Sequence, residues 1–169
     1  SLGVRHFVLA PSFRSLEYEE ALKNGNRCVQ AVEREIDHLN SVCLEWSDWD
    51  DLHQYVVDRN EGFHQANLAT TEYFQRANLP VMVILDVNNR VVWMTCLDLE
   101  TLEQVELPEF PRDEFPADHP LIRTNHPKGY INGILLTERG PMLVASRPIT
   151  TTDAQGERRG RFIMSRYIN

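Results

Sequence analysis

The chain has 169 residues, which is long enough for one domain that buries a real core. Hydrophobic residues make up 42% and charged residues 25%, which is an ordinary globular balance rather than a disordered one. The net charge of −8 argues against a nucleic-acid-binding surface and against a polybasic membrane-surface binder, because no basic stripe is available to meet phosphates. We therefore expect a single domain over residues 1–169.

A helical pattern dominates the first part of the chain. Apolar residues recur mostly at steps of three and four between Leu22 and Trp46, with charged residues between them. We interpret residues 12–57 as a long helical region, well beyond the globular average of about 11–12 residues per helix. We expect it to pack on a sheet at one end and to support a parallel homodimer at the other. The alternative is a single helix that lies along the domain.

Residues 46–55 hold two indoles, three carboxylates, an imidazole and a phenol. We expect Ser47 or Asp48 to cap a second helix, whose first turn carries Asp50, where the helix dipole favours negative charge. One interpretation is a capped helix with two core tryptophans. The other is one wall of a small-molecule pocket, formed by Trp49, Asp50 and Tyr55.

The rest of the chain predicts two short helical segments, near residues 63–68 and 70–76, and then strands. Compact apolar runs separated by turn residues predict an antiparallel sheet within residues 81–168. The five expected strands are 81–85, 90–96, 130–137, 142–149 and 160–168. Residues 107–127 contain five prolines and predict a long loop. The fold class is therefore α+β, with the helices on one face of the sheet.

Cysteines and histidines give no sign of a metal or cofactor site. Cys28 and Cys43 would lie about 22 Å apart on one helix, at ~1.5 Å rise per residue, so at most one intrachain disulfide is expected, through Cys96. The histidines lack the spacing of metal ligands, and we predict no metal and no cofactor. We expect four of them at the surface: His53, His64, His119 and His126.

Catalytic machinery is also not evident. Asp48, Asp50 and Asp51 would suit paired general acid and base catalysis. However, no nucleophile, oxyanion donors or phosphate-binding glycine loop accompanies them. We therefore expect a chain that is not an enzyme and has no catalytic residue, with an aspartate-based hydrolase as the lesser alternative.

Several elements together resemble a known family. The long helix runs into Trp49-Asp50-Asp51, an apolar hairpin surrounds residues 86–89, and the fourth strand ends in Ala145-Ser146-Arg147-Pro148-Ile149. A further strand begins at Gly160. The chain resembles the type-four members of the CHASE group, the sensory extracellular domains associated with cyclases and histidine kinases. The resemblance covers residues 13–166.

The resemblance implies a PAS-like sensor fold and a ligand-sensing input domain on the periplasmic, extracytoplasmic side of the inner membrane. Such domains lie between two transmembrane helices and drive histidine kinases, or diguanylate cyclases and phosphodiesterases that turn over cyclic di-GMP. The chain begins without methionine and stops directly after a strand pattern. We therefore expect transmembrane spans before residue 1 and after residue 169. The family supplies no common ligand.

In such a fold we expect the pocket between the sheet and the helices that cover it, with a ligand that is an unknown small molecule. Arg147 would hold a carboxylate by a two-pronged contact, or would instead pair with Asp50 or Asp51 as a structural clamp. The alternative function is docking of a periplasmic partner protein. The expected ligand-binding residues are Trp49, Asp50, Tyr55, Trp93, Ser146 and Arg147.

Overall fold

The computed structural model describes residues 26–168, with side chains from residue 28 onward. The predicted helical stretch at residues 12–25 lies outside the described residues, and the single domain over residues 1–169 stays a prediction. Four helices lie in the described part of the chain. They are α2 (Asn26–Ser47), α3 (Asp50–Asp58), α4 (Glu61–Asn67) and α5 (Glu72–Arg76).

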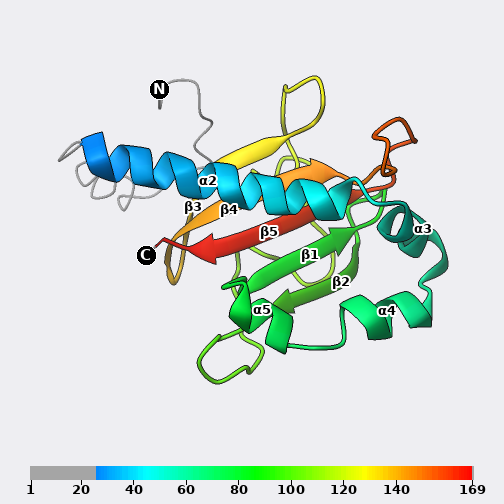
Figure 1. Ribbon diagram of the computed structural model, residues 1–169, viewed down its shortest axis with the longest axis horizontal. Coiled ribbons are helices and arrows are strands. Elements are labelled where there is room, and N and C mark those ends of the chain that lie inside the picture. Colours follow the sequence, from blue (N-terminus) through cyan, green and yellow to red (C-terminus); the bar gives the residue numbers. More distant parts are fainter. Residues whose placement is uncertain (1–25, 169) are drawn as a thin grey trace.

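Five strands form one antiparallel sheet in the order β2-β1-β5-β4-β3. The last strand of the chain therefore lies at the centre, between the two hairpins (Figure 1). The α+β fold class is confirmed; β1 has the predicted bounds, and the bounds of the other strands differ from the predicted ones by at most two residues. The strands are β1 (Val81–Leu85), β2 (Val91–Cys96), β3 (Ile131–Thr137), β4 (Gly140–Pro148) and β5 (Arg161–Tyr167).

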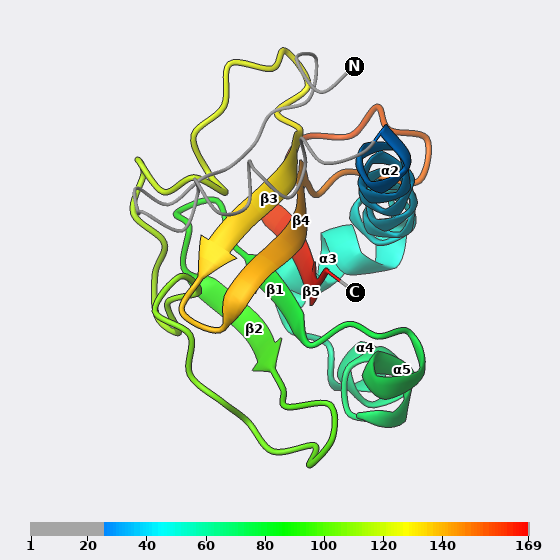
Figure 2. The same cartoon turned by 90° about the vertical axis from the view of Figure 1, so that its left-hand side faces the viewer.

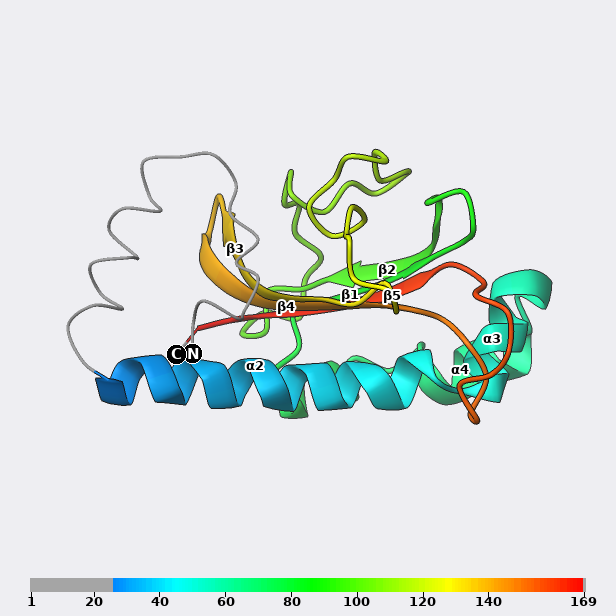
Figure 3. The same cartoon turned by 90° about the horizontal axis from the view of Figure 1, so that it is seen from above.

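Helix α2 lies along one face of the sheet, and the short helices lie on the same side (Figures 2 and 3). Alternate residues of a strand point to opposite faces, so each strand contributes to two cores. In β5, Phe162 and Met164 pack with Ile36 and Leu39 of α2, whereas Ile163 packs on the other face. Each fully buried side chain of this kind contributes about 1.5–3 kcal/mol through removal of apolar surface from water.

The proline-containing loop between β2 and β3 covers the second face of the sheet (Figure 3). Leu107, Phe110, Phe115 and Leu121 are buried there against strand residues such as Val83. Because both faces are covered, β1 is buried at all of its positions. The loop is therefore a structural layer of the domain.

The three cysteines are free thiols. Cys43 lies in the core between α2 and the sheet, and Cys96 lies in the core beneath the loop, so the sheet separates them. The one intrachain disulfide that the sequence allowed, through Cys96, is therefore not formed in this structure. Burial raises the pKa of Cys43 to about 12, which keeps that thiol protonated and unreactive at neutral pH.

His119 links two parts of the covering loop. Its Nε2 lies 2.8 Å from the carbonyl oxygen of Glu109, and its Nδ1 accepts a hydrogen bond from the backbone N–H of Leu121 at 3.0 Å. Protonation of Nδ1 would remove that acceptor. Burial lowers the pKa of His119 below its ordinary value of 6.5. The unfolded chain thus binds a proton at this residue more readily than the folded chain does.

We expect acidification to weaken the domain through His119. Its stabilising contribution is complete above the unfolded pKa and is lost as the pH falls through the lower folded pKa. Between pH 7 and pH 5, the free energy of urea unfolding should therefore fall less in His119→Gln than in the wild type. The control is His38→Gln, which alters an exposed histidine of α2. Equal slopes in wild type and His119→Gln would contradict this expectation.

Candidate functional site

The chain turns sharply between α2 and α3, and a distant loop fixes that turn. The expected cap at Ser47 or Asp48 is wrong, because the N-cap of α3 is Trp49 in an extended conformation with no side-chain cap. The N–H of Trp49 donates to the carbonyl oxygen of Thr150 at 3.2 Å. The N–H of Asp50 donates to the hydroxyl of Thr152 at 3.1 Å. Tertiary contacts thus replace the local cap.

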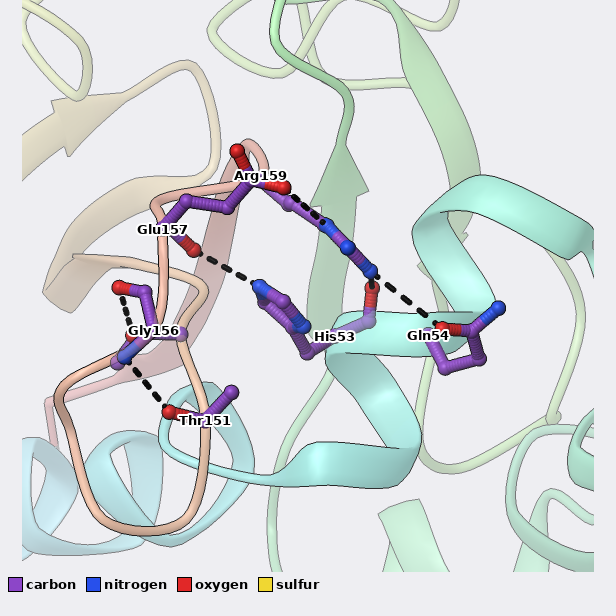
Figure 4. Close-up of polar contacts among 7 residues, drawn as sticks. His53, Gln54, Thr151, Gly156, Glu157 and Arg159 are labelled. Atoms are coloured by element: carbon purple, nitrogen blue, oxygen red, sulfur yellow. Dashed lines mark hydrogen bonds and ion pairs between the residues drawn. The ribbon is translucent and has the colours of Figure 1, made fainter.

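The loop after β4 is held against α3 by two side chains (Figure 4). The Nε2 of His53 lies 2.8 Å from the carbonyl oxygen of Glu157. Arg159 donates from Nη1 to the carbonyl oxygen of His53 at 3.2 Å. His53 is therefore buried, and its expected surface position is wrong. The loop had no strong sequence pattern that would have indicated this contact.

The aromatic candidates lie in one cluster at the edge of the helix-side core. Trp49 and Tyr55 both contact Phe63, with ring centroids 5.1 and 4.8 Å apart. Trp93 contacts Phe74 at 5.8 Å. Trp49 and Trp93 are half-buried, whereas Tyr55 is buried. These side chains pack against each other and against the core.

The polar candidates lie apart from this cluster and from one another. Asp50 is exposed, and its carboxylate accepts a hydrogen bond from the N–H of Thr152 at 2.9 Å. Ser146 faces the loop side of the sheet and donates to the carbonyl oxygen of Leu121 at 2.8 Å. Arg147, the next residue, faces the helix side. The structure does not gather the six predicted residues around one cavity.

Arg147 is buried between α2 and the start of β3. Its Nη1 lies 3.4 Å from the side-chain oxygen of Asn40, and its Cζ lies 3.6 Å from the ring centroid of Tyr130. Within residues 26–168, no ion pair joins Arg147 to Asp50 or Asp51, so the expected clamp is not formed. Its guanidinium instead lies against an aromatic face, a favourable cation–π arrangement.

A cavity of about 220 Å³ lies where the ends of three strands approach the end of α2. We call it the strand-end pocket. Arg147 does not line it, but it packs on Tyr130 and precedes Pro148, which both do. The walls of the pocket come from the last turn of α2, the approach to β3, the end of β4 and the loop that precedes β5. Its main side chains are those of Asp48, Lys128, Tyr130, Pro148, Thr150 and Arg158, and residues 154–156 complete it.

Positive charge gathers around the strand-end pocket. Lys128 and Arg158 line it and are exposed. Arg161 lies next to it, and burial lowers the pKa of Arg161 to about 10, which still leaves a cation at neutral pH. Asp48 is the carboxylate among the lining residues. Burial raises the pKa of Asp48, while Arg147 and the Ser47 hydroxyl act in the opposite direction.

Four residues at or near the pocket were not predicted from the sequence: Lys128, Tyr130, Arg158 and Arg161. One signal could have found part of this set, because Arg158-Arg159-Gly160-Arg161 places three arginines within four residues of an acidic chain. Lys128 and Tyr130 carry no comparable pattern. Their contribution depends on the antiparallel register, which brings the start of β3 to the end of β4.

Comparison with known protein families and solved structures shows the class of protein to which the chain belongs. The fold and the family match define an extracellular sensory domain. More specifically, the chain belongs to the CHASE4 domain family, whose model matches residues 31–169. The predicted family is therefore confirmed. A sensory family of this kind fits a non-catalytic input domain.

Two similar proteins carry further information. The chain is 23% identical over 138 residues to the methanogenesis regulatory histidine kinase FilI of Methanothrix harundinacea (strain 6Ac), covering 82% of this chain and 15% of that protein. It also resembles the crystal structure of the extracellular domain of vpHK1S-Z8, a protein assigned as a histidine kinase. That likeness has a TM-score of 0.58 and 16% identity, and covers 92% of this chain and 60% of that one.

The chain thus spans only part of both proteins, and the second likeness concerns the fold alone. The finer description as PAS-like stays a prediction. Within residues 26–168, no helix combines the length and the apolar character that a bilayer span requires.

Proposed function

We propose that this chain is the ligand-sensing input domain of a membrane-bound histidine kinase, located on the periplasmic side of the inner membrane. The match of the CHASE4 model to residues 31–169 carries this proposal. The similarity to a named histidine kinase supports the choice of output. A diguanylate cyclase or phosphodiesterase output is the alternative that the family resemblance leaves open.

The position of α2 suggests how a signal would leave the domain. The helix spans the sheet (Figure 3). The residue that follows it, Asp48, lines the strand-end pocket. A ligand that contacts both Asp48 and the strand ends would favour one position of α2 over another. Such a signal requires two states of the domain with different affinities for the ligand.

We further propose that two copies of the chain associate through α2 and that transmembrane helices flank the chain in the full-length protein. The exposed face of α2 offers such a surface. The protein-docking alternative has weaker support. In the described region, the exposed large apolar side chains Leu44, Val57 and Val87 lie on different elements, and scattered residues of this kind are normal on protein surfaces.

The full-length receptor in proteoliposomes tests this function. Autophosphorylation would be measured with ATP while amino acids, organic acids, sugars and polyamines are added to the side that holds this domain. A saturable change in autophosphorylation with one of these compounds supports the sensory role. That change should be lost when residues 31–169 are replaced by the CHASE-type domain of another receptor. A parent gene without hydrophobic spans on both sides of this segment would overturn the membrane-receptor proposal.

A further inference from the structure

We infer that the strand-end pocket binds a small organic acid anion that carries one or more carboxylates and no ammonium group. This inference rests on the proposed sensory role and adds the chemical class of the ligand. It follows from an imbalance of charge at the pocket, where buried and exposed cations outnumber the nearby carboxylate. The whole chain, in contrast, carries a net charge of −8.

Arg147 provides the first observation. The residue is only 4% exposed, yet its Nε has no hydrogen-bond partner. Its polar contact is a long one, at 3.4 Å to the neutral side chain of Asn40. Asp48 is close enough to interact electrostatically with Arg147, but no hydrogen-bonded ion pair between them is formed in the described part of the chain. A buried charge without a hydrogen-bonded partner of opposite sign is costly. The nearest face of its guanidinium is covered by Tyr130, which also lines the pocket.

Arg161, which lies on the loop side of the sheet, also makes its hydrogen bonds to neutral groups. Its Nη1 donates to the carbonyl oxygen of Gly129 at 2.8 Å and to the hydroxyl of Ser146 at 2.9 Å. Both acceptors are neutral. Arg158 contributes to the lowering of the pKa of Arg161, because the two like charges lie close together. An anion between or beside these groups would relieve that repulsion.

The backbone at Gly129 leaves room for the side chains of Arg158 and Arg161. Its φ is +75°, which favours glycine, and a Cβ there would lie 2.8 Å from Pro148 and 3.3 Å from Nη1 of Arg158. The Nη2 of Arg161 would lie 3.4 Å from the same Cβ. The backbone at Gly129 thus leaves room for guanidinium groups on two sides. Gly129 is itself buried, so this arrangement is part of the folded structure.

Other carboxylates of the adjoining loop are already engaged. Glu157 pairs with Arg159 at 3.1 Å, and Asp153 accepts hydrogen bonds from Thr151 and from the N–H of Gln155. Asp48 remains as the nearby acidic group; it lines the pocket with Lys128 and Arg158, and it interacts electrostatically with Arg147. A carboxylate ligand would supply the missing negative charge and would receive charge-assisted hydrogen bonds from Lys128 and Arg158.

The size of the cavity limits the ligand. A volume of about 220 Å³ is below the roughly 300–1,000 Å³ of typical drug-sized pockets. It matches the size of a small organic acid. Because Asp48 lies between the end of α2 at Ser47 and the start of α3 at Asp50, an anion in the pocket would change the electrostatic forces on the junction between the two helices.

Isothermal titration of the 169-residue chain tests this inference. The probes are sodium acetate, succinate, citrate and inorganic phosphate at constant ionic strength, with succinamide as the neutral control and β-alanine as the zwitterion. We expect at least one organic acid to bind saturably. The double variant Lys128→Gln/Arg158→Gln should weaken that binding by about tenfold or more, since hydrogen bonds to charged groups contribute about 1.5–3 kcal/mol each.

Two further variants distinguish the possible outcomes. Arg76→Gln removes an exposed arginine from the distant helix α5 and should leave binding unchanged. Asp48→Asn removes the like charge and should strengthen binding of the organic acid. Loss of binding in Asp48→Asn, or binding of β-alanine in preference to the acids, would overturn the inference in favour of a zwitterion.

No binding by any of the acids, or equal weakening in Arg76→Gln, would also overturn it. Binding of phosphate alone would show a general anion site and would contradict the carboxylate class. The proposed sensory function is judged separately. If the proteoliposome assay responds to a neutral compound and the double variant keeps that response, the domain is a sensor whose ligand is not an anion.

Discussion

Replacement of Gly160 by alanine is expected to prevent stable folding or to lower the free energy of unfolding by about 3 kcal/mol or more, from backbone strain and a steric clash. Gly160 has a φ of +101°, and a Cβ there would collide with the carbonyl oxygen of Leu85. The carbonyl of Gly160 also accepts a hydrogen bond from Ile149 at 3.1 Å. Because Gly160 immediately precedes β5, the start of the central strand depends on it.

The control for this experiment is Gly140→Ala. Gly140 also has a positive φ, of +113°, but a Cβ there would meet nothing within 4 Å. The control therefore carries backbone strain without a collision. Urea unfolding followed by circular dichroism compares the two variants. Equal losses of stability would show that the close approach of β1 to Gly160 is unimportant.

Replacement of Phe162 by alanine has the second largest expected effect, a loss of about 3–5 kcal/mol from the cavity that it leaves. Phe162 is completely buried on the helix side of the sheet, and its ring stacks on Trp46 at 5.4 Å with an interplanar angle of 3°. The substitution should therefore loosen the contact between α2 and the sheet. Chemical unfolding measures the loss of stability, and tryptophan fluorescence reports on the contact itself.

Phe115→Ala provides a matched comparison. Phe115 is equally buried but belongs to the core beneath the covering loop. Both variants should lose stability, whereas only Phe162→Ala should change the environment of Trp46. A native tryptophan spectrum in Phe162→Ala would mean that α2 does not depend on this aromatic pair for its position. The coupling that we propose between α2 and the sheet would then need another route.

The elements of this domain were largely predictable from local patterns. Compact apolar runs indicated all five strands, and turn residues such as Asn89, which has a φ of 62°, indicated the hairpin between β1 and β2. Three- and four-residue spacing indicated α2. These patterns are local because a strand or a helix depends on residues within a few positions of one another.

The candidate site was much less predictable. The six residues chosen from the sequence are distributed among the aromatic cluster, an exposed turn and both faces of the sheet. Ser146 and Arg147 illustrate the reason. They are neighbours in the chain, but successive residues of a strand point to opposite faces, so they were unlikely partners in a single pocket. We now propose Arg147 as the member of that set closest to a binding site.

Local patterns in the chain were sufficient to predict the fold class and the strand segments, and the resemblance was sufficient to predict the CHASE4 family. The folded arrangement was needed to see that residues 150–152 fix the turn before α3, that Lys128 and Arg158 line one pocket, and that Arg158 and Arg161 both approach Gly129. The physical reason is that a periodic pattern reports which side of an element is buried. Which distant residues share a cavity is set by strand order and by the course of the loops, and neither has a local signature in the chain.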